Sequence, residues 1–407
     1  MATIFRNPNA TRAAYPPALQ RILSIERARE CRDWLSQWDM LSPDPTPLWE
    51  LPGLAARLGV GAIHVKDESR RSPLGSFKAL GAPAALLRLV LQRLPQARNT
   101  PHAVLASAFA GALKDFVVIS ATDGNHGRAL AAAARSAGCR CVIVLHAQVS
   151  EEREAPIAAL GAQVVRIAGN YDDSVREAAR LAGANGWQVV SDTSYEGYED
   201  IPRDVMQGYA VLADELFDAQ QPADGCPFSH VVLQAGVGGF AAGVVSYFWQ
   251  RYGERRPLFI VVEPEQAECL LQSARAGRPE RASGSIDSLM AGLACGEASP
   301  LAWRFLQPAV DAFVTVSDAQ AAEAMRTFAR PRDGDIPVLA GESGAAGLAA
   351  ALALHESAAA RELALGPQAR VLLVNTEGAT APRLYESVAG IAPADVLRAQ
   401  EAWSAAS

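Results

Sequence analysis

Ser72-Pro73-Leu74-Gly75-Ser76-Phe77-Lys78 is the stretch around which the other informative segments of the chain make chemical sense. The chain has 37 basic residues, and only three of them are lysine: Lys66, Lys78 and Lys114. An amine that must act as a nucleophile or a base near neutral pH cannot be replaced by arginine, because a guanidinium group stays protonated. Each lysine is therefore a candidate for chemistry.

Lys78 has the most favourable context of the three. The acidic residues that follow Lys66 should keep it charged, and Lys114 lies in a Gly- and Ala-rich connection. Lys78 falls in the first turn of an apolar run at 77–94, with Ser76 as the predicted N-cap. Partial desolvation there would favour the neutral amine. The alternative is a lysine on the solvated side of a helix.

The composition argues against several classes of protein. The 407 residues are long for one domain, with net charge −7 and no basic cluster, so nothing suggests binding to nucleic acid or an anionic membrane. Apolar stretches fall short of the roughly 20 residues of a bilayer span, and no signal segment is visible, so we expect a cytoplasmic location. Cysteine and histidine spacings predict no metal site. Cys269 and Cys295 bracket a Gly-rich stretch and are either buried thiols or a conditional disulfide.

Strand-like and helical segments alternate after an N-terminal arm at 1–60. Strands are predicted at 62–66, 116–120, 141–145, 163–167, 188–191, 231–233, 259–262, 312–316 and 371–374. Helices are predicted between them at 129–136, 151–160 and 174–181. Such alternation is typical of α/β proteins with parallel sheets. We predict two α/β sheets, with the polar joint at 220–225 as a domain boundary.

Ala121-Thr122-Asp123-Gly124-Asn125-His126-Gly127 follows a predicted strand and begins a helix. Its backbone N–H groups would lie at a helix N-terminus, which suits an anion such as a carboxylate. Its glycines permit a close approach of the backbone. The structural alternative is an ordinary glycine turn with an Asn or Asp cap.

Gln234-Ala235-Gly236-Val237-Gly238-Gly239-Phe240 also connects a predicted strand to a helix. Glycines at such a connection are typical of a phosphate cradle. Gly236, Gly238 and Ala241 also form G-x-G-x-x-A, and Glu263 ends the next predicted strand, as in a dinucleotide-binding fingerprint. Taken alone, this segment favours an NAD enzyme equally.

Asp192-Thr193-Ser194-Tyr195-Glu196-Gly197-Tyr198-Glu199-Asp200 is an acidic, aromatic loop at the end of a predicted strand. Crowded carboxylates on a loop are commonly solvated. At the mouth of a site they would attract cations, and one buried near a like charge could be tuned as a base.

Asn375-Thr376-Glu377-Gly378 follows the last predicted strand. A threonine hydroxyl there can donate to an uncharged ring nitrogen or accept from it, whereas a carboxylate would keep that nitrogen protonated.

Together these segments resemble the fold type II enzymes of pyridoxal 5'-phosphate, the tryptophan synthase β-like group. The order matches: a Ser-Phe-Lys lysine, a Gly-Asn-His-Gly loop, a glycine-rich loop and a Thr after a late strand. Within that group the chain is similar to the diaminopropionate ammonia-lyase family in Lys66-Asp67-Glu68-Ser69, in Asp123, where relatives usually carry a small residue, and in the acidic loop 192–200. The likeness runs from about residue 40 to 385 and departs at 72–76.

The resemblance implies two open, twisted, mostly parallel sheets in two domains, with the active site between them. A large cofactor-binding domain would comprise 1–85 and 228–407, and a small substrate-side domain 86–227. The implied cofactor is pyridoxal 5'-phosphate. Its implied contacts are the attachment amine of Lys78, Asn125 at the 3'-oxygen, a phosphate cradle and a ring-nitrogen neighbour: Gly236, Val237, Gly238, Gly239, Phe240 and Thr376.

The implied activity is α,β-elimination of 2,3-diaminopropionate, in both D and L forms, to pyruvate and two ammonia. Asp123 and Asp192 would face this amino-acid substrate, and the protein would be a homodimer. An NAD dehydrogenase would explain the glycine loop but would leave Lys78, the Asp-Gly-Asn-His-Gly loop and the acidic loop without roles. Another fold type II β-eliminase, such as a serine or threonine dehydratase, and a non-catalytic binder remain as alternatives.

Overall fold

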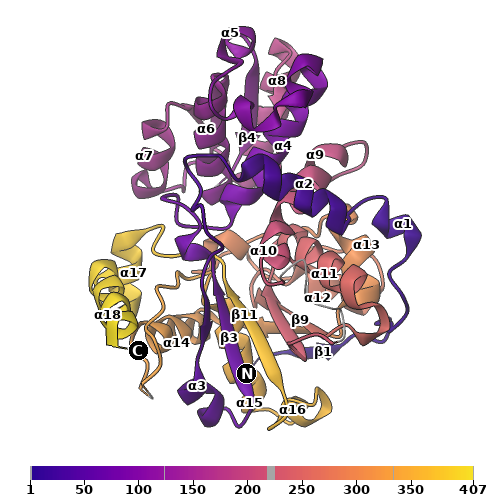
Figure 1. The fold of residues 1–407 in the computed structure, drawn as a ribbon, viewed down its shortest axis with the longest axis vertical. Coiled ribbons are helices and arrows are strands. Elements are labelled where there is room, and N and C mark those ends of the chain that lie inside the picture. The colour runs from indigo at the N-terminus through magenta and orange to yellow at the C-terminus, as the bar shows by residue number, and fades with distance from the viewer. Residues whose placement is uncertain (1, 123, 218–224, 333, 407) are drawn as a thin grey trace.

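A large and a small β-sheet organise the computed structural model, which describes residues 2–122, 124–217, 225–332 and 334–406 (Figure 1). The large sheet has seven strands in the order β1-β10-β9-β8-β11-β3-β2. Its inner strands are parallel, and short antiparallel strands form both edges. The strands are β1 (Ile4–Arg6), β2 (Leu48–Glu50), β3 (Ala62–Asp67), β8 (His230–Gln234), β9 (Leu258–Pro264), β10 (Ala312–Val316) and β11 (Arg370–Asn375).

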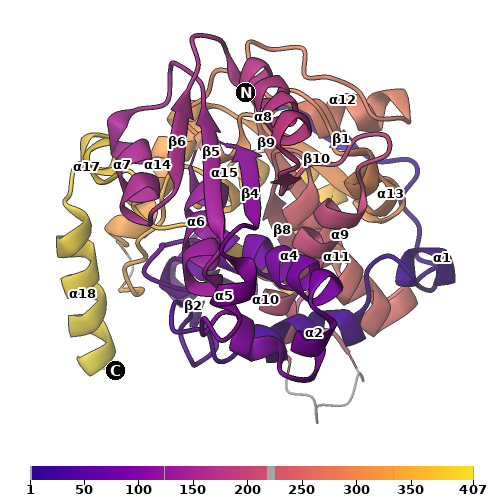
Figure 2. The ribbon, with the colours of Figure 1, turned by 90° about the horizontal axis from the view of Figure 1, so that it is seen from above.

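The small sheet has four parallel strands in the order β6-β5-β4-β7. They are β4 (Val117–Ala121), β5 (Arg140–Leu145), β6 (Gln163–Arg166) and β7 (Gln188–Val189). Helices α6 (Asn125–Ala137), α7 (Glu151–Ala159) and α8 (Tyr171–Asn185) connect them. Figure 2 shows β4, β5 and β6 side by side, with this sheet in front of the large one.

Both faces of each sheet are covered by buried side chains. Successive side chains along a strand point to opposite sides, so neighbouring residues of one strand belong to different cores. In β8, Val231 and Leu233 belong to one core, whereas Val232 belongs to another. The first core contains α11 (Gly239–Tyr252) and α13 (Pro300–Ala309), and the second contains α14 (Asp318–Ala329) and α15 (Ala346–His355). Burial on both faces explains why these strands are continuously apolar rather than alternating.

The first core continues from the large sheet into the small one. It includes Val118 and Ile143 of the small sheet, and it passes through α4 (Lys78–Arg93) and α9 (Asp200–Tyr209). In Figure 1 these two helices lie at about the height of β4 of the small sheet and above β9 and β11 of the large sheet. Residues at the ends of α4 and α9 are therefore placed where the two sheets meet.

The remaining helices cover the periphery. They are α1 (Pro17–Gln20), α2 (Ile25–Leu35), α3 (Pro52–Arg57), α5 (Ala110–Leu113), α10 (Val211–Asp214), α12 (Cys269–Ala276), α16 (Ala359–Glu362), α17 (Pro382–Ala389) and α18 (Pro393–Ala406). Short 3-10 turns are η1 (Glu68–Arg70), η2 (Pro95–Asn99), η3 (Pro101–Val104), η4 (Gly253–Arg255) and η5 (Ala291–Leu293). No helix among the described residues has both the length and the apolar character needed to cross a membrane.

The two mostly parallel α/β sheets confirm the predicted fold class. The predicted N-cap is wrong: Phe77 precedes α4, whereas Ser76 forms an extended bridge to Glu377, and Phe77 N donates to Thr376 O at 3.0 Å. The edge strands β1 and β2 were not predicted, because three-residue strands give no periodic signal. The joint at 220–225 lies outside the described residues except for Gly225.

Gly208→Ala is expected to lower the free energy of unfolding by about 1–3 kcal/mol, the usual cost of overpacking. A Cβ at position 208 would lie 2.3 Å from the carbonyl oxygen of Leu80, so α9 and α4 would have to separate. Urea denaturation measures the loss. Gly183→Ala in α8 is the matched control: a Cβ there meets nothing within 4 Å, and the better helix propensity should leave stability unchanged or higher. Equal stability of Gly208→Ala and wild type would contradict this packing argument.

Candidate active site

One cavity gathers the residues predicted for the site. It opens between the start of α4, the start of α6, the β8–α11 loop and the segment after β11. Its lining includes every predicted site residue that the structure describes: Lys78, Asn125, Asp192, Gly236, Val237, Gly238, Gly239, Phe240 and Thr376. Asp123 lies outside the described residues.

An ion pair occupies the centre of this cavity. Lys78 Nζ donates to Asp192 Oδ2 at 2.5 Å, and the two side chains are only 18% and 22% exposed. Burial opposes the charge on Lys78, but the Asp192 carboxylate outweighs it and raises the pKa of Lys78. Burial is likewise outweighed at Asp192, whose pKa is lowered by Lys78 and His126. The expectation of a neutral amine is therefore wrong for this arrangement, because it considered desolvation without a facing carboxylate.

His126 is a neighbour of this pair that sequence analysis left without a role. Its Nε2 lies 2.9 Å from the carbonyl oxygen of Val190, so Nε2 carries a proton. Its Nδ1 faces Asp192 Oδ2 at 3.8 Å. Burial lowers the pKa of His126, with Asp192 opposing and Lys78 reinforcing that change. The ring is held in one orientation beside Asp192.

Asp192 is the member of the acidic loop that faces the cavity. None of the other loop carboxylates lines the cavity among the described residues, and Glu199 instead pairs with Arg304. The loop is fixed on both sides of Asp192. Tyr198 OH donates to Val189 O at 3.0 Å, and the hydroxyls of Ser194 and Ser299 lie 2.7 Å apart.

The β8–α11 loop forms a cradle in which positions 236 and 238 have no room for a side chain. Gly238 has φ +98°, which favours glycine, and a Cβ there would lie 2.8 Å from Leu306 Cδ1. A Cβ on Gly236 would lie 2.7 Å from Cys295 Sγ. The backbone amides at the start of α11 can therefore come close to an anion, and the cradle fits the phosphate of the predicted cofactor.

Thr376 fits a contact with an uncharged ring nitrogen. Its side chain is buried, and its hydroxyl oxygen accepts from Gln234 Nε2 at 2.9 Å. Gln234 Nε2 also donates to Val374 O at 2.8 Å, which fixes the amide. Because the threonine oxygen is used as an acceptor, its O–H remains available as a donor. Gln234 lies inside the quoted glycine segment, yet its orienting role is visible only in three dimensions.

Asn125 is held by a residue for which the sequence suggested no role. Its Nδ2 donates to Glu377 Oε2 at 2.5 Å, and Glu377 also accepts from Ser343 N at 3.1 Å. An amide nitrogen has two N–H groups, so the second can reach the 3'-oxygen of a cofactor. That contact stays a prediction.

Glu342 joins the cavity to the small sheet. It is buried, and Arg153 of α7 donates to Glu342 Oε1 at 2.9 Å. Burial and the neighbouring Glu377 raise the pKa of Glu342 to about 7. Neither Glu342 nor Arg153 belongs to a motif or follows a strand, so sequence analysis gave no signal for them.

Glu263 does not serve a dinucleotide. It is fully buried, and its two oxygens accept from Leu270 N at 2.7 Å and Leu271 N at 2.8 Å, which caps α12. Glu263 is absent from the cavity lining. Cys269 and Cys295 do not form a disulfide in this structure, and Cys269 Sγ lies 3.6 Å from Gly236 O.

Comparisons with known proteins agree with this geometry. Residues 40–381 match the family described as pyridoxal-phosphate dependent enzyme. The chain is 40% identical over 358 residues to diaminopropionate ammonia-lyase of Salmonella typhimurium, which covers 84% of this chain and 87% of the relative. Two solved structures of the Escherichia coli diaminopropionate ammonia-lyase are also similar. The complex with an aminoacrylate-PLP azomethine reaction intermediate has TM-score 0.85, 35% identity and coverage of 96% and 97%. The complex with D-serine has TM-score 0.86, 36% identity and the same coverage.

Proposed function

The chain belongs to the family of pyridoxal-phosphate-dependent enzymes, and from that premise we propose that it is a diaminopropionate ammonia-lyase. The reaction is the α,β-elimination of 2,3-diaminopropionate to pyruvate and two ammonia. The observation that carries the proposal is the Asp192 carboxylate, 2.5 Å from Lys78 Nζ in the cavity. An ionised carboxylate beside the reacting centre favours an amino acid with a second ammonium group.

Each part of the proposed cofactor has a matching group in the chain. Lys78 would attach it, the cradle at 236–240 would hold its phosphate, Thr376 would contact its ring nitrogen and Asn125 its 3'-oxygen; all of these residues line the cavity. When bound, pyridoxal phosphate supplies an electron sink for the charge left at the α-carbon. The remaining chemistry consists of proton transfers and recognition by side chains.

Asp192 is the proposed proton acceptor at the α-carbon. In the free protein the Lys78 charge lowers the pKa of Asp192 against the effect of burial. When Lys78 is uncharged, no ammonium would face Asp192. Burial would then act with less opposition and raise the pKa of the carboxylate, which makes it a better proton acceptor.

We propose Asp123 as a second carboxylate, on the opposite face of the substrate from Asp192. The two would allow both D and L enantiomers to be deprotonated, as the resemblance to the family implies. The β-ammonium group leaves as ammonia, and hydrolysis of the resulting enamine gives pyruvate and the second ammonia. A β-hydroxyl substrate offers no cation to these carboxylates, so slow turnover of serine and threonine is expected.

The purified protein with pyridoxal phosphate is expected to show a visible absorbance band and to convert D- and L-2,3-diaminopropionate to pyruvate. Two ammonia should form for each pyruvate, because both nitrogens leave the carbon skeleton. Absorbance and coupled assays for the two products measure this, with D- and L-serine as matched substrates. Rapid serine turnover without activity on diaminopropionate would instead support a dehydratase.

The domain division, the homodimer and the cellular location are part of the same proposal. The domain division at 85/86 and 227/228 and a homodimer are supported by the family resemblance. A cytoplasmic location is supported by the six cysteines, none of which forms a disulfide in the structure, as is usual in reducing compartments. Light scattering of the purified protein tests the dimer.

A further inference from the structure

Tyr209 is a polar group at the cavity that the proposed reaction leaves without a role. It is 1% exposed, lies at the end of α9 and lines the cavity. Its hydroxyl has no hydrogen bond of standard geometry among the described residues. A buried hydroxyl without a well-formed hydrogen bond destabilises the fold, and the group that interacts with the Tyr209 hydroxyl is the Lys78 amine.

Three glycines inside helices make the room for this side chain. A Cβ on Gly81 of α4 would lie 2.3 Å from Tyr209 Cε1, and one on Gly243 of α11 would lie 3.3 Å from Tyr209 Cβ. Gly208 lets the α9 backbone approach α4, as described above. Glycine inside a helix makes the helix less stable than alanine does. The close packing around Tyr209 is therefore kept at some cost in helix stability.

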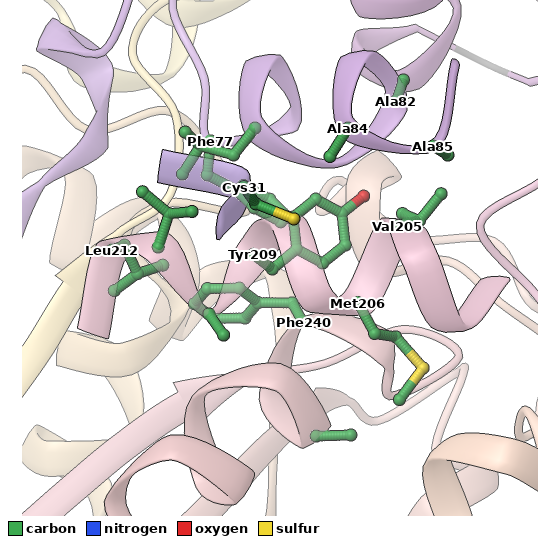
Figure 3. Close-up of a cluster of buried hydrophobic side chains, with 14 of the residues drawn as sticks. Cys31, Phe77, Ala82, Ala84, Ala85, Val205, Met206, Tyr209, Leu212 and Phe240 are labelled. Carbon is green, nitrogen blue, oxygen red and sulfur yellow. The ribbon is translucent and has the colours of Figure 1, made fainter. Parts of the chain in front are cut away.

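Aromatic contacts then fix the ring against both cofactor-binding segments. Its centroid lies 4.7 Å from that of Phe77, which precedes Lys78, and 6.4 Å from that of Phe240, which ends the cradle. Figure 3 shows Tyr209 together with Phe77 and Phe240 in this cluster. Lys78 Nζ lies 5.3 Å from the Tyr209 ring centroid. The Tyr209 ring is thus held beside the Lys78 amine by aromatic packing and by the contact of that amine with the ring.

The charges around Tyr209 keep its proton in place. Burial raises the pKa of Tyr209, while Lys78 lowers it and Asp192 raises it. The net effect is a raised pKa, so the phenol carries its O–H at neutral pH. The phenol oxygen can accept an N–H of Lys78 whether the amine is charged or neutral, whereas the Asp192 carboxylate binds the ammonium form most strongly.

We propose that Tyr209 is the positioning residue for the Lys78 amine in its uncharged state. Asp192 holds the ammonium form, and the Tyr209 oxygen accepts an N–H of the neutral form, so that the nitrogen lone pair stays free to form a bond. Lys78 would be neutral when it adds to the cofactor's aldehyde carbon, where a C=N bond replaces the C=O bond and the carbonyl oxygen leaves as water. It is neutral again between its displacement by the substrate amine and its return. This inference rests on the proposed attachment of the cofactor to Lys78.

Tyr209→Phe tests the proposal, with Tyr385→Phe as the matched control. Tyr385 is also fully buried with a hydroxyl that has no hydrogen-bond partner among the described residues, but it lies outside the cavity. Removing either hydroxyl should leave the thermal midpoint equal or higher. Pyridoxal phosphate is added to each apoprotein, and the growth of the visible band is followed.

Tyr209→Phe should form the band about 3- to 10-fold more slowly, the range expected for one neutral hydrogen bond. Its kcat should fall by a similar factor while KM changes less than about twofold, because the lost contact is to Lys78 and not to substrate. Tyr385→Phe should match wild type in both. Band growth in Tyr209→Phe at the wild-type rate, or a defect confined to KM, would overturn the inference alone. A wild-type protein without a band would remove the proposed function and this inference with it.

Discussion

Lys78→Ala is expected to abolish turnover of diaminopropionate, with a loss of about 10,000-fold or more, as for other groups that form the covalent bond in catalysis. The variant lacks the nitrogen that would attach the cofactor, and it also lacks the cation that faces Asp192 at 2.5 Å. Pyruvate formation measures the first loss. The visible band after addition of pyridoxal phosphate measures attachment independently of turnover.

Lys78→Arg separates these two losses. Arginine keeps a positive charge beside Asp192 but stays protonated and cannot bond to the cofactor, so the fold should be retained without attachment or turnover. Lys114→Ala is the matched control, because Lys114 is exposed and does not line the cavity. Ordinary steady-state activity in Lys78→Ala or Lys78→Arg would rule out the role proposed for Lys78.

Most of the predicted site residues lie in loops that follow parallel strands. Loops at the carboxyl ends of neighbouring parallel strands lie together. Thr376 follows β11, the glycine cradle follows β8, and β11 and β8 are neighbours. Asn125 follows β4 and Asp192 follows β7, which are also neighbours. The strands were recognised from the sequence, but the gathering of these loops at one site was implied by the family resemblance, because the sequence does not show which strands are neighbours in a sheet.

The residues that sequence analysis missed depend on packing between elements. Tyr209 reaches the cavity from the last turn of a helix, because glycines let α9 approach α4. Glu342 enters from a segment without regular structure. Sequence analysis also gave the wrong charge state for Lys78. Lys78 begins α4 and Asp192 follows β7, and their contact in the fold raises the pKa of the amine and keeps it charged. No periodic pattern records such a contact.

Asp192→Asn is expected to lower kcat by about 100- to 10,000-fold, the contribution of a positioned general base. Asparagine keeps the size of the side chain but cannot accept the α-proton at neutral pH. The substitution also removes the carboxylate that raises the pKa of Lys78. Burial then dominates at Lys78 and favours the neutral amine, so attachment of pyridoxal phosphate to the apoprotein should become possible at lower pH than in wild type.

Rate measurements on the separate D and L enantiomers complete this test, because Asp192 and Asp123 are proposed to lie on opposite faces of the substrate. A loss confined to one enantiomer would assign Asp192 to that face, and a loss for both would make it common to the two reactions. Glu199→Gln is the matched control: Glu199 lies in the same loop but pairs with Arg304 outside the cavity. It should retain wild-type rates. Unchanged kcat for both enantiomers in Asp192→Asn would refute the proposed base, even if the cofactor band formed normally.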